Sequence, residues 1–109
     1  KFGVIAILRA SVIRQQRYVR QLGLSERYAA SLPLDTGVSG LESDTAGEHL
    51  LAVGQELIDS HGADVLILGC AGMARFRQRI AADLNVPVID PCQAATIQAV
   101  ASVRLAIAS

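Results

Sequence analysis

Residues 65–73 read Val65-Leu66-Ile67-Leu68-Gly69-Cys70-Ala71-Gly72-Met73. The run of branched aliphatic residues predicts a strand covered on both faces, and the glycines that follow predict a tight turn. An amphipathic pattern then predicts a helix over residues 73–84. Cys70 would therefore stand at a helix N-terminus, where backbone N–H groups and the helix dipole favour a thiolate. It is the best catalytic candidate in the chain, with simple packing as the competing interpretation.

The rest of the chain repeats this alternation of strands and helices. Strands are predicted over 2–8, 28–32, 63–69 and 86–89, and helices over 12–22, 45–62, 73–84 and 91–108. Ser11 is expected to cap the first helix, Thr45 and Glu48 to form a capping box on the second, and Asp90 to cap the last. The last helix is apolar, which predicts a packed helix. Residues 33–44 are expected to form an irregular loop.

Strands that are separated by helices pair in parallel through right-handed crossovers. We therefore expect one α/β domain, a three-layer α/β/α sandwich with a four-stranded parallel sheet in the order 2-1-3-4. This order has a single switch point, between the first and third strands, and ligands bind where the loops leaving those strands part. Those loops are 8–11 and 69–73. The topology by itself thus directs a ligand to Cys70.

The polar groups of these two loops suit an anionic or carbonyl-bearing ligand. Arg9 and Ser11 border the expected crevice, and the forked donors of Arg9 can bind a carboxylate or a carbonyl group. The N–H groups of Ala71, Gly72 and Met73 can receive similar groups. Gly72 is explained equally well as an ordinary turn residue.

Composition excludes several functions. With 109 residues, ten basic and ten acidic, the chain has no electrostatic footprint for nucleic acid or for a membrane surface. Two cysteines without a disulfide framework indicate a reducing compartment, hence the cytoplasm. The His, Cys and carboxylate residues lack metal-ligand spacing, and the glycine pattern of dinucleotide sites is absent, so neither a metal nor a cofactor is expected.

Two motifs carry a resemblance to a known family. Gly69-Cys70-Ala71-Gly72-Met73, followed after the next helix by Asn85-Val86-Pro87-Val88-Ile89-Asp90, resembles the hydantoin and allantoin racemase branch of the Asp/Glu racemase superfamily. The similarity extends over nearly the whole chain. It implies that residues 1–109 are the second of two similar α/β domains, so we expect the C-terminal part of a longer protein.

The resemblance also implies a mechanism. Members of this superfamily use two cysteines, one from each domain, to remove a proton from one face of a carbon acid and to return it on the other, without a cofactor. Cys70 would be one of them, and a 5-substituted hydantoin or an amino-acid derivative would be the substrate. We further expect a homo-oligomer, and we expect the isolated chain to be inactive.

Some alternatives remain open. Aspartate or glutamate racemases, maleate isomerase and arylmalonate decarboxylase share this fold, and a non-catalytic ligand-binding module would use Cys70 only for packing. The family usually has hydroxyl residues at the end of the first strand, where this chain has Ala6 and Ile7, which leaves the substrate open. Cys92 takes the place of a small or apolar residue, so we expect it to pack. His49 and His61 are expected on the surface.

Overall fold

The computed structural model describes residues 1–35 and 38–108. A four-stranded parallel sheet has the order β2-β1-β3-β4, as predicted. The strands are β1 (Phe2–Ala6), β2 (Tyr28–Pro33), β3 (Val65–Leu68) and β4 (Val88–Ile89). The α-helices are α1 (Arg9–Gln21), α2 (Ala46–His61), α3 (Arg77–Leu84) and α4 (Pro91–Ala108), and 3-10 turns occupy η1 (Ser25–Arg27), η2 (Val38–Glu42) and η3 (Ala71–Phe76).

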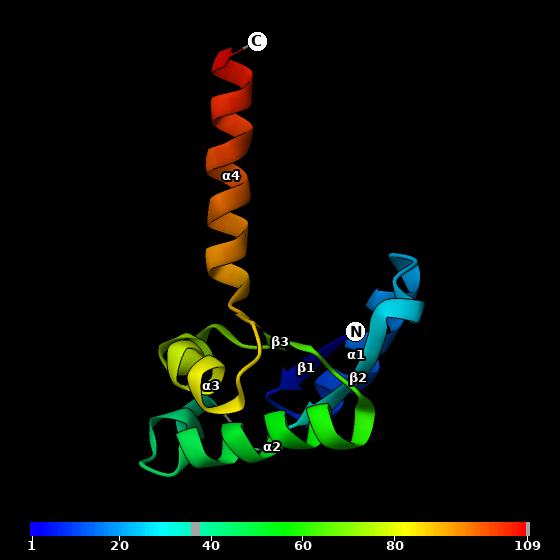
Figure 1. Cartoon of the computed structure of the whole chain (residues 1–109), viewed down its shortest axis with the longest axis vertical. Helices are drawn as coiled ribbons and strands as arrows, with labels where there is room; N and C mark the ends of the chain where they lie inside the picture. The colour runs from blue at the N-terminus through cyan, green and yellow to red at the C-terminus, as the bar shows by residue number, and fades with distance from the viewer. Residues whose placement is uncertain (36–37, 109) are drawn as a thin grey trace.

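The two faces of the sheet are covered unequally (Figure 1). On one face, Ile5 of β1 and Leu66 of β3 lie in the buried core with Leu50 and Leu57 of α2 and Ile80 of α3. Alternate strand residues point to the opposite face. There α1 is the main cover, and an open apolar groove of about 460 Å³ remains, lined by strand residues Phe2, Val4 and Ile67 and by Gln15, Tyr18, Val19, Leu22 and Leu24.

This thin cover explains a wrong prediction for α1. The spacing of the apolar residues predicts that Val12, Tyr18, Val19 and Leu22 point inward. Tyr18 and Leu22 are nevertheless 62% and 53% exposed, and Val19 is the buried residue of the helix. The three arginines that follow Ile13 in α1, Arg14, Arg17 and Arg20, lie on its exposed side, as expected. One helix facing two strands can bury only a narrow stripe of its surface.

Helix starts differ from the predictions. α1 begins at Arg9, and Leu8, with extended backbone, holds the cap position. Ser11 lies within the helix and donates its N–H to the Leu8 carbonyl at 3.0 Å. Thr45 stands before α2 in a helical conformation and makes no side-chain cap bond, so the capping box is not formed. A cap residue needs extended backbone for its side chain to reach back to the first amides.

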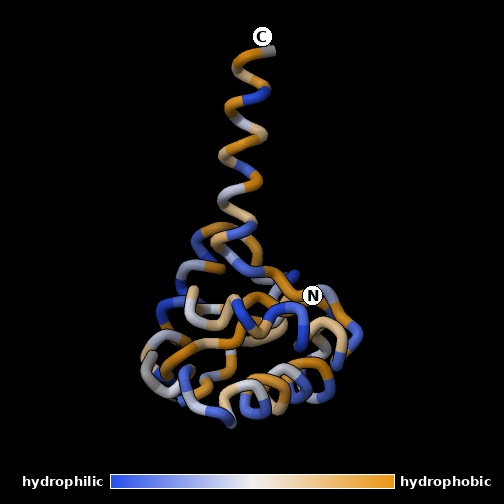
Figure 2. Tube along the Cα trace, turned by 90° about the vertical axis from the view of Figure 1, so that its left-hand side faces the viewer, coloured by the Kyte–Doolittle hydropathy of each residue, from blue (hydrophilic) through white to orange (hydrophobic). Residues whose placement is uncertain are grey.

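The last helix is the largest departure from expectation. Asp90 caps α4 as predicted, because its carboxylate accepts N–H bonds from Cys92 at 3.4 Å and Gln93 at 3.2 Å. The helix does not pack, however, and stands away from the body (Figure 1). Figure 2 shows hydrophobic residues all along it. Five of these, Ile97, Val100, Val103, Leu105 and Ile107, are 49–80% exposed. Within the described residues, no helix is long and apolar enough to cross a membrane.

Candidate active site

The carboxyl ends of β1 and β3 lie side by side at the predicted switch point. Ile5 pairs with Leu68 in the parallel register, and the N–H of Gly69 donates to the Ile5 carbonyl at 2.8 Å. A Cβ at Gly69 would lie 2.5 Å from that carbonyl oxygen and 3.3 Å from the Ala6 Cα. Only glycine fits between these strand ends. The tight join fixes where the next residue, Cys70, leaves the sheet.

Cys70 is a free, half-buried cysteine that packs partly against the core. Its backbone is extended, with φ −146° and ψ 137°, and it occupies the cap position of η3. The α-helix was expected to begin at Met73 but begins at Arg77, after the six-residue 3-10 turn Ala71–Phe76. The side chain of Met73 is fully buried, which holds this turn against the core. The dipole of α3 therefore starts further from the thiol than the sequence suggested.

The three amides proposed for ligand binding are not equivalent. The Met73 N–H donates to the Cys70 carbonyl at 3.0 Å and is already used within the turn. Ala71 and Gly72 open the turn, where N–H groups have no partner inside the helix. In the described part of the chain neither amide donates to another backbone group. A Cβ at Gly72 would lie 3.8 Å from the Cys70 Sγ, so this backbone passes close to the thiol.

A wall beside Gly72 comes from a segment that the sequence did not single out. Leu41 of η2 is buried, and its Cδ1 would lie 2.9 Å from a Cβ at Gly72. The Arg75 guanidinium donates to the Leu41 carbonyl and also lies over the Phe76 ring, 4.3 Å from its centroid. These contacts tie η2 to η3. Residues 36 and 37 of the expected irregular loop lie outside the described residues.

Arg9 lies at the same edge of the sheet and is already paired. Its guanidinium donates to the Asp35 carboxylate at 2.8 Å, and both side chains are exposed. Asp35 follows β2 and has a left-handed backbone with φ 58°, which Asp tolerates better than most residues. Ser11, two residues after Arg9, is half-buried. The Arg9–Asp35 ion pair joins the start of α1 to the loop after β2. The sequence pattern did not predict this pair.

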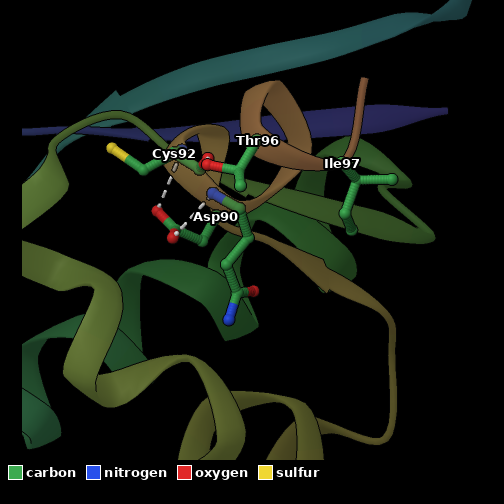
Figure 3. Close-up of a pocket in the computed structure, with 5 residues that line it drawn as sticks. Asp90, Cys92, Thr96 and Ile97 are labelled. Atoms are coloured by element: carbon green, nitrogen blue, oxygen red, sulfur yellow. Dashed lines mark hydrogen bonds between the residues drawn. The ribbon is translucent and has the colours of Figure 1, made fainter. Parts of the chain in front are cut away.

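The end of β4 contributes a second thiol to this edge. Cys92 was expected to pack, but it is exposed, because α4 leaves the body at its first turn. It lines a pocket of about 450 Å³ with Asp90, Gln93, Thr96 and Ile97 (Figure 3). Asp90 is only 4% exposed. His49 and His61 are exposed, as expected, and belong to α2, on the other side of the core from this pocket.

This arrangement defines a class: a doubly wound α/β domain with a half-buried thiol and open backbone amides at its switch point. The family can be named as well. A family model described as Asp/Glu/Hydantoin racemase matches residues 1–99, and the chain belongs to this family.

Related proteins agree with this assignment. The chain is 35% identical over 96 residues to a hydantoin racemase of Paenarthrobacter aurescens, covering 86% of this chain and 41% of that protein. It is 33% identical over 92 residues to a hydantoin racemase of Pseudomonas sp. (strain NS671), covering 83% and 37%.

Solved structures give the same result. The fold matches an allantoin racemase from Klebsiella pneumoniae with a TM-score of 0.90 and 29% identity, covering 97% of this chain and 44% of that one. An allantoin racemase from Pseudomonas fluorescens matches with a TM-score of 0.90 and 31% identity, covering 96% and 46%. The chain thus spans less than half the length of these relatives.

Proposed function

We propose that this chain supplies one half of the active site of a cofactor-independent hydantoin racemase, with Cys70 as one of two acid/base thiols. The observation that carries the proposal is the position of Cys70: half-buried, at the switch point, and beside the open amides of Ala71 and Gly72. The alternative of a purely packing cysteine is less well supported, because neither Gly69 nor the Gly72 approach would be needed to bury a thiol.

The proposed reaction balances without an oxidant or a reductant. A thiolate takes the proton from the substrate carbon, so that a C–H bond breaks and an S–H bond forms. The negative charge moves to the adjacent carbonyl oxygen, where the amides of Ala71 and Gly72 can donate to it. A thiol on the opposite face then gives up its proton to the carbon. Cys70 reaches one face, and we propose that the other thiol lies in the part of the relatives that this chain does not match.

The substrate is proposed to be a 5-substituted hydantoin. Two features support this choice: the curated relatives are named hydantoin racemases, and a hydantoin offers carbonyl and imide groups to match the amides and Arg9. Arg9 is held at the edge by Asp35, which restricts the guanidinium to one region of the crevice. We also propose a cytoplasmic location, which suits two free thiols, and self-association through the exposed side chains of α4.

Ligand protection of the thiol tests the proposal on this chain. In a Cys92→Ser background, the rate of Cys70 alkylation by iodoacetamide is followed by mass spectrometry with and without hydantoin. We expect the ligand to slow alkylation in a saturable manner. Equal rates with and without hydantoin would remove the proposed site.

A further inference from the structure

We propose that the pocket at the start of α4 is the subsite for the 5-substituent of the substrate, and that Cys92 and Ile97 determine which substituents it accepts. This inference rests on the proposed function, because it assumes that the hydantoin ring lies beside Cys70. It assigns a role to two residues to which the family resemblance gave none.

The register of the sheet brings the pocket and Cys70 to the same edge. Ile67 of β3 pairs with Ile89 of β4, and each cysteine follows its paired residue by three positions. The chain turns into η3 after one strand and into α4 after the other. A ring bound at Cys70 can therefore extend a substituent along the edge toward β4.

The hydrogen bonds within the pocket determine which of its polar groups can still bind a substituent. Both Asp90 oxygens accept backbone N–H bonds, and the Thr96 hydroxyl donates to the Cys92 carbonyl at 2.8 Å. These polar groups are already occupied. In Figure 3 the side chains of Cys92 and Ile97 lie on opposite sides of Thr96, and Asp90 lies next to Cys92. Cys92 and Ile97 contribute a thiol and an aliphatic branch to the lining of the pocket. Such walls favour an uncharged, aliphatic substituent.

Charge excludes another group of substituents. The Asp90 carboxylate is 4% exposed and forms part of the wall. A substituent that carries its own carboxylate would place a second negative charge beside the first. Gln93 offers one side-chain amide, which can serve a polar, uncharged substituent such as a ureido group. The expected order of preference is isobutyl, then ureido, then carboxymethyl.

Alkylation of the two native thiols, measured separately by mass spectrometry, tests the subsite on the unmodified chain. The probes are hydantoin, 5-isobutylhydantoin, allantoin and hydantoin-5-acetic acid. We expect unsubstituted hydantoin to slow alkylation of Cys70 alone, and 5-isobutylhydantoin to slow alkylation of both cysteines. Hydantoin-5-acetic acid should protect Cys92 least among the substituted probes.

A matched pair of variants separates the pocket from the rest of α4. Ile97→Ala should weaken binding of 5-isobutylhydantoin by about tenfold and leave binding of unsubstituted hydantoin unchanged. Ile107→Ala removes a similar side chain at the far, exposed end of the helix and should change neither. Circular dichroism checks that both variants keep their helices.

The outcomes distinguish this inference from the proposed function. If Cys70 is protected by every probe and Cys92 is protected equally with or without a 5-substituent, the subsite is wrong and the proposed function stands. If only Cys92 responds, the ring does not lie beside Cys70, and both the proposed function and the subsite built on it are wrong. If neither thiol responds, both proposals fail.

Discussion

The N–H of Gly69 donates to the carbonyl oxygen of Ile5 at 2.8 Å, and a side chain on Gly69 would lie 2.5 Å from the same oxygen. The obstacle is backbone, which cannot swing aside as a side chain can. Gly69→Ala should therefore separate β3 from β1 at the site and lower the free energy of unfolding by about 1–3 kcal/mol.

Urea denaturation monitored by circular dichroism measures this loss. Gly72→Ala is the matched comparison, because its new methyl group would meet the flexible Leu41 Cδ1 and should cost less. Equal stability of Gly69→Ala and the wild type would mean that the strand ends are not held as described.

Asp90→Ala should loosen the first turn of α4. The substitution removes the acceptor of the Cys92 and Gln93 amides, and loss of an N-cap costs about 0.5–2 kcal/mol. Amide hydrogen exchange over residues 92–96 should accelerate, while exchange in β1 and β3 should not change. Asp90→Asn keeps an acceptor and should restore most of the protection. Faster exchange in the sheet instead would show that Asp90 supports the core.

In a form extended by the part of the relatives that this chain does not match, Cys70→Ser should reduce racemisation by about 10²–10⁴-fold, because a hydroxyl is too weak an acid for the proposed proton transfers. Polarimetry with single enantiomers of a 5-substituted hydantoin measures the rate. Cys92→Ser, which alters only the proposed subsite, should change the preference among 5-substituents and should not cause the loss expected for Cys70→Ser. A Cys70→Ser enzyme of normal activity would show that the wrong thiol has been chosen.

The 109-residue chain alone should not racemise any hydantoin or aspartate. One thiol reaches one face of the carbon, and an open crevice lacks the water-excluded surroundings that strengthen charge stabilisation. Optical rotation of single enantiomers should stay at the rate of the buffer control. Turnover that disappears in Cys70→Ser would mean that one domain, alone or as a dimer, is a complete enzyme.

The chain should self-associate through α4. Its aliphatic side chains, including Val103 and Ile107, are more than half exposed, and contiguous apolar surface drives association. Sedimentation velocity should show a mass above that of the monomer which rises with concentration. The double variant Val103→Gln and Ile107→Gln should shift the distribution toward monomer. A Leu24→Gln variant, altered away from α4, serves as control and should not.

The strand order and the switch point were predictable because they depend on alternation and handedness, which a sequence records directly. The Asp90 cap was equally visible, since Asp followed by Pro is a strong local signal. The start of α3 was not, because burial of Met73 draws its segment into a 3-10 turn that periodicity cannot distinguish from an α-helix.

Other parts of the site depend on long-range contacts. Leu41 and Asp35 lie in a segment without periodicity, and they form hydrogen bonds with Arg75 and Arg9, which are distant in sequence. The apolar composition of α4 indicates that the helix packs against another surface, but it does not indicate whether that surface belongs to this domain. Its separation from the body therefore could not be read from the pattern.

Asp90 caps α4 and also lines the pocket, so the start of the helix and the proposed subsite share one residue. Eighteen residues give an arm of about 27 Å. A small tilt imposed at the far end, near Ile107, moves Cys92, Thr96 and Ile97 together, because all three belong to α4, and it changes their distance from Cys70 at the end of β3. Whatever holds the tip of α4 therefore sets how far the proposed subsite lies from that thiol.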